Sequence, residues 1–81
     1  LQRAQNKLIK AAESYSEALK IRKQLAEANP AYYMPYVAET LNNIANLQRE
    51  KNNFYHAEQG YLQAIEIYTQ LTDLKSDIYL P

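Results

Sequence analysis

The sequence contains no cysteine, and it has only one glycine and one histidine in 81 residues. Without cysteine the chain has no disulfide framework, no thiolate zinc site and no cysteine nucleophile. No apolar run approaches the ~20 residues that a membrane-spanning helix needs, and no signal-peptide pattern is visible in these residues. Nine basic residues balance nine acidic ones. This neutral balance gives no electrostatic footprint for nucleic acid or for an anionic membrane surface.

The residues that are abundant predict an all-α chain. One glycine and three prolines stand against many alanine, leucine, glutamine, glutamate and lysine residues, which all favour helices. A chain of this length forms one small domain at most and buries only about 60% of the surface that its unfolded form exposes. Its core is therefore small.

The chain repeats itself with a period of 46 residues. Of the 35 pairs that this offset aligns (81 − 46), 12 are identical, and no gap is needed. The period lies in the range of helical solenoids. The identical pairs are Leu1/Leu47, Gln2/Gln48, Arg3/Arg49, Asn6/Asn52, Ala11/Ala57, Tyr15/Tyr61, Ala18/Ala64, Ile21/Ile67, Gln24/Gln70, Leu25/Leu71, Tyr33/Tyr79 and Pro35/Pro81.

The repeat predicts how the chain divides. Residues 1–35 are expected to be a partial unit, with the end of one helix (helix A), a second helix (helix B) and a connector. Residues 36–81 are expected to be a unit with helix A at 36–50, helix B at 53–75 and the start of the next connector. The sequence begins at Leu1 rather than at a methionine. The expectation is therefore a window of about 1.75 repeats from a longer array.

Apolar spacing places three helices. The first stripe predicts a helix over residues 7–28, ended by Asn29-Pro30 because a residue before proline is pushed out of the helical region. Residues 1–29 contain no proline or glycine, so one continuous helix is the alternative. Residues 30–35 are expected to be a connector, and Asn53 is expected to cap the third helix. Ala57, Tyr61 and Ala64 are expected in its core.

Residues 38–71 resemble a tetratricopeptide repeat. The resemblance rests on the large and small residues Leu41, Ile44-Ala45, Ala57, Tyr61 and Ala64. "LNNIANL", followed by a helix that ends in "AIEIY", is similar to the long-period branch that includes kinesin light chains. The resemblance implies antiparallel helix pairs stacked in a right-handed solenoid. The sequence departs from the family by having asparagine, Asn6 or Asn52, where glycine is usual, and by lacking the proline after helix B.

No constellation of residues indicates catalysis. His56 is the only histidine and has no ligand partners at a suitable spacing. Glu13 and Glu17 lie four residues apart, but a solvated charged face explains them. No phosphate-binding glycine-rich loop or nucleophile motif is present. The chain is therefore expected not to be an enzyme and to need no cofactor or metal.

The residues chosen as a binding site are Asn42, Asn46, Arg49 and Arg3. The first three share one face of the second helix, opposite Leu41, Ile44 and Ala45. The resemblance implies that this face lines a concave groove, where an asparagine amide can pair with the backbone of an extended peptide. Arg3 is equivalent to Arg49 one repeat earlier. The tyrosines Tyr32, Tyr33 and Tyr36 are expected either to pack the connector or to anchor a partner.

The leading hypothesis is therefore a protein–protein interaction scaffold that binds a protein or peptide segment on the face formed by helix A. The alternative is a structural module that packs against its own parent chain or self-associates, with no external ligand. Because a solenoid unit covers its apolar faces with its neighbours, self-association is expected, by helix exchange between copies as one route. Binding to RNA is disfavoured by the neutral charge, and no insertion into membranes is expected.

Overall fold

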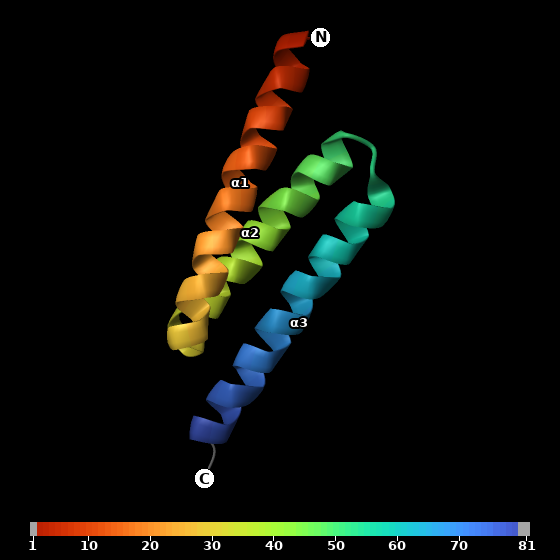
Figure 1. Cartoon of the computed structure of the whole chain (residues 1–81). Coiled ribbons are helices and arrows are strands. Elements are labelled where there is room, and N and C mark those ends of the chain that lie inside the picture. Colours follow the sequence, from red (N-terminus) through yellow and green to blue (C-terminus); the bar gives the residue numbers. More distant parts are fainter. Residues whose placement is uncertain (1, 80–81) are drawn as a thin grey trace.

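The structure, a computed structural model, describes residues 2–79 and the side-chain surroundings of residues 6–73. It consists of three α-helices: α1 (Gln2–Ala28), α2 (Pro30–Glu50) and α3 (Phe54–Tyr79). Each helix runs antiparallel to the one before it (Figure 1). Both α1 and α3 pack against α2, and the contacts between helices in the described part are confined to these two pairs. The expected all-α class is confirmed.

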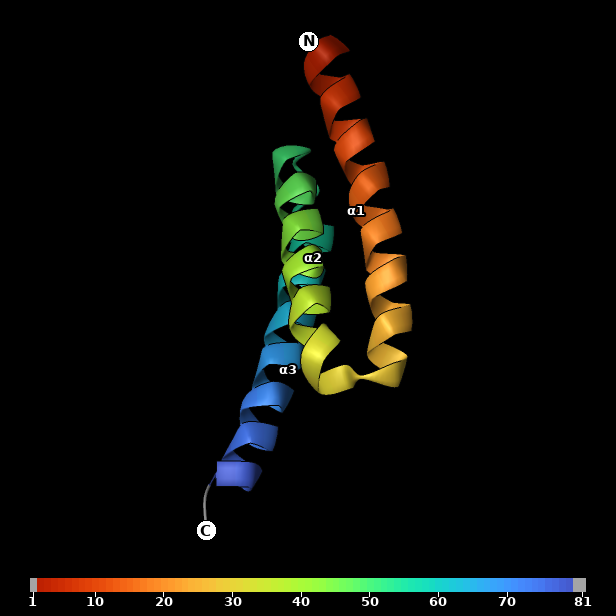
Figure 2. The same cartoon turned by 90° about the vertical axis from the view of Figure 1, so that its left-hand side faces the viewer.

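The first helix is longer than the stripe of apolar residues predicts. α1 runs without a break from Gln2 to Ala28, so the alternative of one continuous helix is correct. The expected end of a preceding helix and a turn at Asn6 are wrong. No proline or glycine interrupts this segment, and asparagine costs a helix interior well under 1 kcal/mol. The start of α1 therefore extends beyond α2 in Figure 2.

The expected connector over residues 30–35 is also wrong, because these residues form the first turns of α2. Pro30 occupies the first helical turn, where the missing N–H has no intrahelical partner to lose. Pro35 lies inside the helix and removes one further N–H from the ladder. The backbone N–H of Tyr33 donates to the Asn29 carbonyl at 3.1 Å, which closes the first turn. Only Asn29 separates α1 from α2.

The turn between α2 and α3 lies where the sequence predicts it. α2 ends at Glu50 as expected, and Asn52 adopts φ 64° in the left-handed region that asparagine tolerates. Asn53 accepts the first helical hydrogen bond through its carbonyl, from the Ala57 N–H at 3.0 Å. Its side-chain Nδ2 donates to Gln48 Oε1 at 2.9 Å. α3 then continues to Tyr79, beyond the expected end at residue 75.

The core lies along both sides of α2. Its centre is a cluster of buried residues from all three helices, with Leu19, Tyr33, Met34 and Ile67 partly buried around it. Ala57 and Ala64 are buried as expected, whereas Tyr61 is only half-buried and is not a core residue. The buried cluster consists of Ala26, Val37, Ala38, Leu41 and Ala64.

Candidate partner-binding surface

The middle helix leaves one face uncovered. α1 and α3 occupy two sides of α2, and a row of side chains at helical spacing remains on the third. All of these side chains are exposed except Asn42, which is half-buried. We call this row the α2 strip; it consists of Tyr32, Tyr36, Glu39, Asn42, Asn46 and Arg49.

The strip brings together three of the four residues chosen from the sequence. Asn42, Asn46 and Arg49 lie on one face of α2, away from the buried Leu41 and Ala45. One of the two polar atoms of the Asn46 amide already has a partner, because its Oδ1 accepts a hydrogen bond from the Tyr61 hydroxyl of α3. Its Nδ2 is left as the group that can donate to a ligand. Nothing in the sequence indicated this hydrogen bond.

Arg3 does not join this set. It lies in the first turn of α1, and its side chain is outside the described ones. Because α1 has no turn near Asn6, Arg3 belongs to the same helix as Leu25 rather than to a preceding helix A. Its equivalence to Arg49 in the repeat is therefore not matched by an equivalent place in the fold.

An aromatic corner extends the strip at the start of α2. The rings of Tyr32 and Tyr33 meet edge to face with centroids 4.9 Å apart, and Tyr36 lies 5.9 Å from Tyr32. Together with Arg22 and Leu25 they line a surface depression of about 300 Å³. Tyr32 is 58% exposed and Tyr36 is 40% exposed. Exposed, rigid tyrosine rings with free edges are a common means of anchoring partner segments.

Arg22 fixes this corner to the strip. Its Nη1 donates to Thr40 Oγ1 at 2.7 Å and to the Tyr36 carbonyl at 3.1 Å. Its guanidinium carbon lies 5.4 Å from the centroid of the Tyr36 ring, within cation–π range. The nearby Tyr32 hydroxyl raises the pKa of Tyr36 above its ordinary value, by repulsion between the ionised groups and by a hydrogen bond.

A second hollow was not predicted from the sequence. A groove of about 430 Å³ lies between α1 and α3, with α2 as its floor. Its floor is apolar and includes Met34 and Val37, and its rim carries Lys23 from α1 and Glu66 from α3. One feature of the sequence could have indicated this groove. Polar residues such as Lys23 and Glu66 border the apolar residues of both outer helices.

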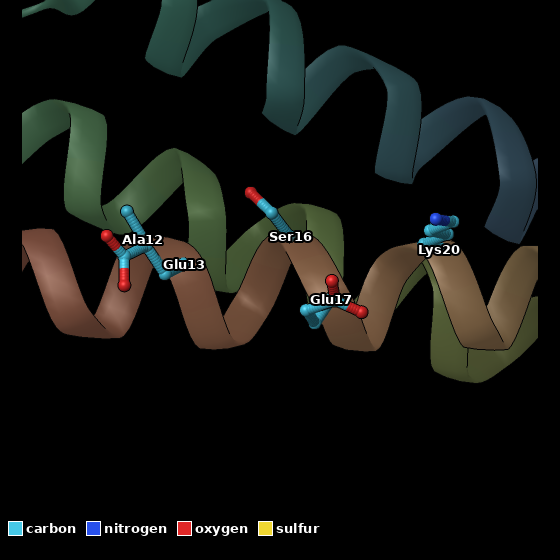
Figure 3. A pocket seen from close by; sticks show the side chains of 5 residues that line it. All are labelled: Ala12, Glu13, Ser16, Glu17 and Lys20. Atoms are coloured by element: carbon cyan, nitrogen blue, oxygen red, sulfur yellow. The ribbon is translucent and has the colours of Figure 1, made fainter.

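A further hollow, of about 620 Å³, offers little for binding. It lies along α1 alone and is lined by Ala12, Glu13, Ser16, Glu17 and Lys20 (Figure 3). No second helix contributes to its lining, and Glu13 and Glu17 are exposed. This is the solvated charged face that the sequence predicts for these two glutamates.

Metal-binding clusters and membrane spans were searched for over the part of the chain that the structure describes. There, no three histidine, cysteine, aspartate or glutamate side chains gather in a way that could hold a metal ion. Within the same part, no helix combines the length and the apolar character required to cross a bilayer. His56 is exposed and stacks edge to face with Tyr55 at 5.5 Å. Comparison with known proteins gives no match to a family model, a curated protein or a solved structure.

Proposed function

We propose that this chain is a protein–protein interaction module of the tetratricopeptide type, in which helix pairs stack as a right-handed solenoid. In this proposal the α2 strip binds an extended segment of a partner protein. The 46-residue repeat and the antiparallel packing of α2 on α3 support the architecture. The observation that carries the function is that α2 is covered on two sides and keeps a continuous polar and aromatic row on the third.

The chemistry of the strip suits a peptide backbone. Asn42 and the Nδ2 of Asn46 supply amide groups that can hydrogen-bond to peptide units. Arg49 is exposed at the end of the strip, where it can bind a carboxylate with two parallel hydrogen bonds. Tyr32 and Tyr36 offer ring faces to an apolar side chain of the ligand. The hydrogen bond from Tyr61 orients Asn46 before any ligand arrives.

A screen of the chain against a library of extended peptides tests this function. For any peptide that binds, Asn46→Ala is expected to weaken binding roughly tenfold, because it leaves a ligand group unpaired. Arg49→Ala is expected to do the same for peptides that carry a carboxylate. Gln59→Ala is the control, since Gln59 is exposed on α3 outside the strip. Unchanged affinity in both strip variants would place the ligand elsewhere, and no binding by any peptide would leave the function without support.

A second candidate function, self-association, is favoured by a different observation. Both outer helices carry large apolar side chains that are more than two-fifths exposed. Ile21 and Leu25 lie on α1, and Phe54, Ile65 and Tyr68 lie on α3. Exposed apolar rows of this kind mark association surfaces. Sedimentation over a range of micromolar concentrations tests this function, and a monomer throughout that range would exclude it.

A further inference from the structure

Among the described residues that line the depression at the tyrosine corner, Arg22 is the only charged one. The others are Leu25 of α1 and the three tyrosines at the start of α2. The volume of the depression, about 300 Å³, is at the lower end of the range for small-ligand sites. The wall is therefore mostly aromatic, and the space suits a single ring with a short polar group.

Arg22 has only neutral hydrogen-bond partners in the described part of the chain. Its side chain is half-buried, and both of its hydrogen bonds run from Nη1, one to the Thr40 hydroxyl and one to the Tyr36 carbonyl. Neither acceptor carries a negative charge. A charged group that is partly removed from water is usually paired with an opposite charge. The depression therefore contains a positive charge without a counter-ion.

The guanidinium of Arg22 also has donors left for a ligand. It carries five N–H groups, of which Nη1 holds two. No buried side-chain nitrogen in the described part lacks a partner, so Nε and Nη2, which bond to none of these residues, are open to solvent. This edge of a guanidinium can bind both oxygens of one carboxylate. The Nη1 bonds and the Tyr36 ring, 5.4 Å away, already hold the group in place, which lowers the entropy cost of binding.

We propose that this depression binds a small carboxylate that carries an aromatic ring. In this site Nε and Nη2 of Arg22 donate to the two carboxylate oxygens, and the rings of Tyr32 and Tyr33 pack against the ring of the ligand. These two rings meet edge to face at 4.9 Å, an arrangement that a third ring can extend. The site goes beyond the proposed function, because it takes a small ligand and needs no partner segment.

The charges around the depression favour a ligand with one negative charge. A cation would be repelled by the guanidinium of Arg22, and a neutral ring would make no use of its free N–H edge. A phosphate dianion would bring more negative charge than one arginine balances. It would also meet repulsion from Glu39, which is exposed on the next turn of α2 and acts on the Tyr36 hydroxyl from outside the lining of the depression.

Titration with phenylacetate tests the site, with the ring NMR signals of Tyr32 and Tyr36 as the readout. Phenylacetamide has nearly the same shape without the charge and is expected to bind about tenfold more weakly. Arg22→Gln is expected to weaken phenylacetate binding by about the same factor and to change phenylacetamide binding little. Tyr32→Ala removes an exposed part of the wall and is expected to weaken both ligands about threefold.

Lys20→Gln is the control, because it removes one positive charge from the same helix at an exposed position that lines a different hollow. Circular dichroism checks that each variant keeps its helices; if Arg22→Gln does not fold, Tyr32→Ala and the comparison of the two ligands decide. Equal affinity for phenylacetate and phenylacetamide overturns the proposal, as does unchanged phenylacetate binding in Arg22→Gln.

Two further outcomes also count against the site. Phenyl phosphate binding more tightly than phenylacetate overturns the preference for one negative charge. Unmoved signals of Tyr32 and Tyr36 at millimolar phenylacetate overturn the site itself. Peptide binding by the α2 strip is judged separately by its own screen, so the failure of one does not decide the other.

Discussion

Gly60 and Ala45 face each other where α3 crosses α2, so closely that a Cβ placed on Gly60 would lie 2.9 Å from the Ala45 Cβ. The same Cβ would lie 3.4 Å from the Leu41 carbonyl oxygen. Ala45, Ala57 and Ala64 are buried around this point. The single glycine of the chain therefore permits the close approach of two helix backbones. Small side chains determine the distance between α2 and α3.

Gly60→Ala is expected to destabilise the fold, although alanine is the better helix former. The propensity gain of up to about 1 kcal/mol is outweighed by an overpacking cost of roughly 1–3 kcal/mol, because both clashing groups are attached directly to helix backbone. Urea unfolding measures the change. Ser14→Ala is the matched control, since Ser14 is equivalent to Gly60 in the repeat but is exposed. A more stable Gly60→Ala variant would show that the helices can move apart at no cost.

Ala64→Leu is expected to lower the free energy of unfolding by roughly 1–3 kcal/mol. Ala64 is 0% exposed and belongs to the buried cluster that joins α2 and α3, so three added heavy atoms have no space. Gln63→Leu introduces the same side chain at the adjacent exposed position and is expected to change stability little. Equal melting temperatures for the two variants would contradict this packing.

The sequence was sufficient for the number of helices, for the end of α2 and for the buried small residues of α3, because these depend on local spacing. Ala57 and Ala64 were predicted as buried, and the left-handed Asn52 as a turn. The connector over residues 30–35 was mispredicted because two prolines suggested a break. Pro30 and Pro35 are tolerated near the start of a helix that α1 and α3 hold in place. Tertiary packing, which a local pattern cannot report, decided that segment.

The side-chain hydrogen bonds of the candidate binding surface depend even more on contacts between helices than the fold does. The common face of Asn42, Asn46 and Arg49 follows from helical spacing and was predicted. The bond between Asn46 and Tyr61 joins residues 15 positions apart, and the bond between Arg22 and Thr40 joins residues 18 apart. Side-chain pairs this distant along the chain leave no mark in a single sequence. The sequence analysis also placed Tyr61 in the core, although its side chain is only half-buried. The match of Tyr61 to Tyr15 in the repeat indicates that the two residues have similar surroundings, but it does not indicate how deeply either side chain is buried.

Thr40→Val is expected to cost about 1–2 kcal/mol of stability. Thr40 is 1% exposed, accepts from Arg22 Nη1 and donates to the Tyr36 carbonyl at 2.9 Å. Valine at this position leaves the half-buried Arg22 guanidinium without one of its two acceptors. Thr72→Val is the control, because Thr72 makes the same bond to the carbonyl four residues earlier but is exposed. Thermal unfolding at low protein concentration compares them. Equal small effects would mean that the Arg22 contact contributes nothing.

The tyrosine corner is expected to respond to alkaline pH. The Tyr32 hydroxyl raises the pKa of Tyr36, so Tyr32→Phe should move the titration of Tyr36 back toward its ordinary value near 10. Because this pKa is raised in the folded state, its contribution to stability is fully present below the unfolded pKa. It is lost as pH rises through the folded pKa. Ring NMR signals of Tyr36 follow the titration, with Tyr55→Phe as a distant control. An unmoved titration would contradict the coupling.

The hydrogen bond between Asn46 and Tyr61 holds the Asn46 amide in one orientation on the α2 strip. Tyr61→Phe removes the hydroxyl that binds Asn46 Oδ1 and is expected to cost about 0.5–1 kcal/mol, since the bond is exposed. Asn46→Ala loses the same bond but gains up to about 0.7 kcal/mol of helix propensity, so its stability is expected to stay close to that of the wild type.

A double-mutant cycle over Asn46→Ala and Tyr61→Phe separates these contributions, because propensity cancels and only the coupling remains. The expected coupling is about 0.5–1 kcal/mol in urea unfolding. Peptide affinity measured on the same four proteins then shows what the bond does for binding. If it orients Asn46, Tyr61→Phe weakens affinity about threefold in Asn46 proteins and has no effect in the Asn46→Ala background. A loss of equal size in both backgrounds would mean that Tyr61 contacts the ligand itself.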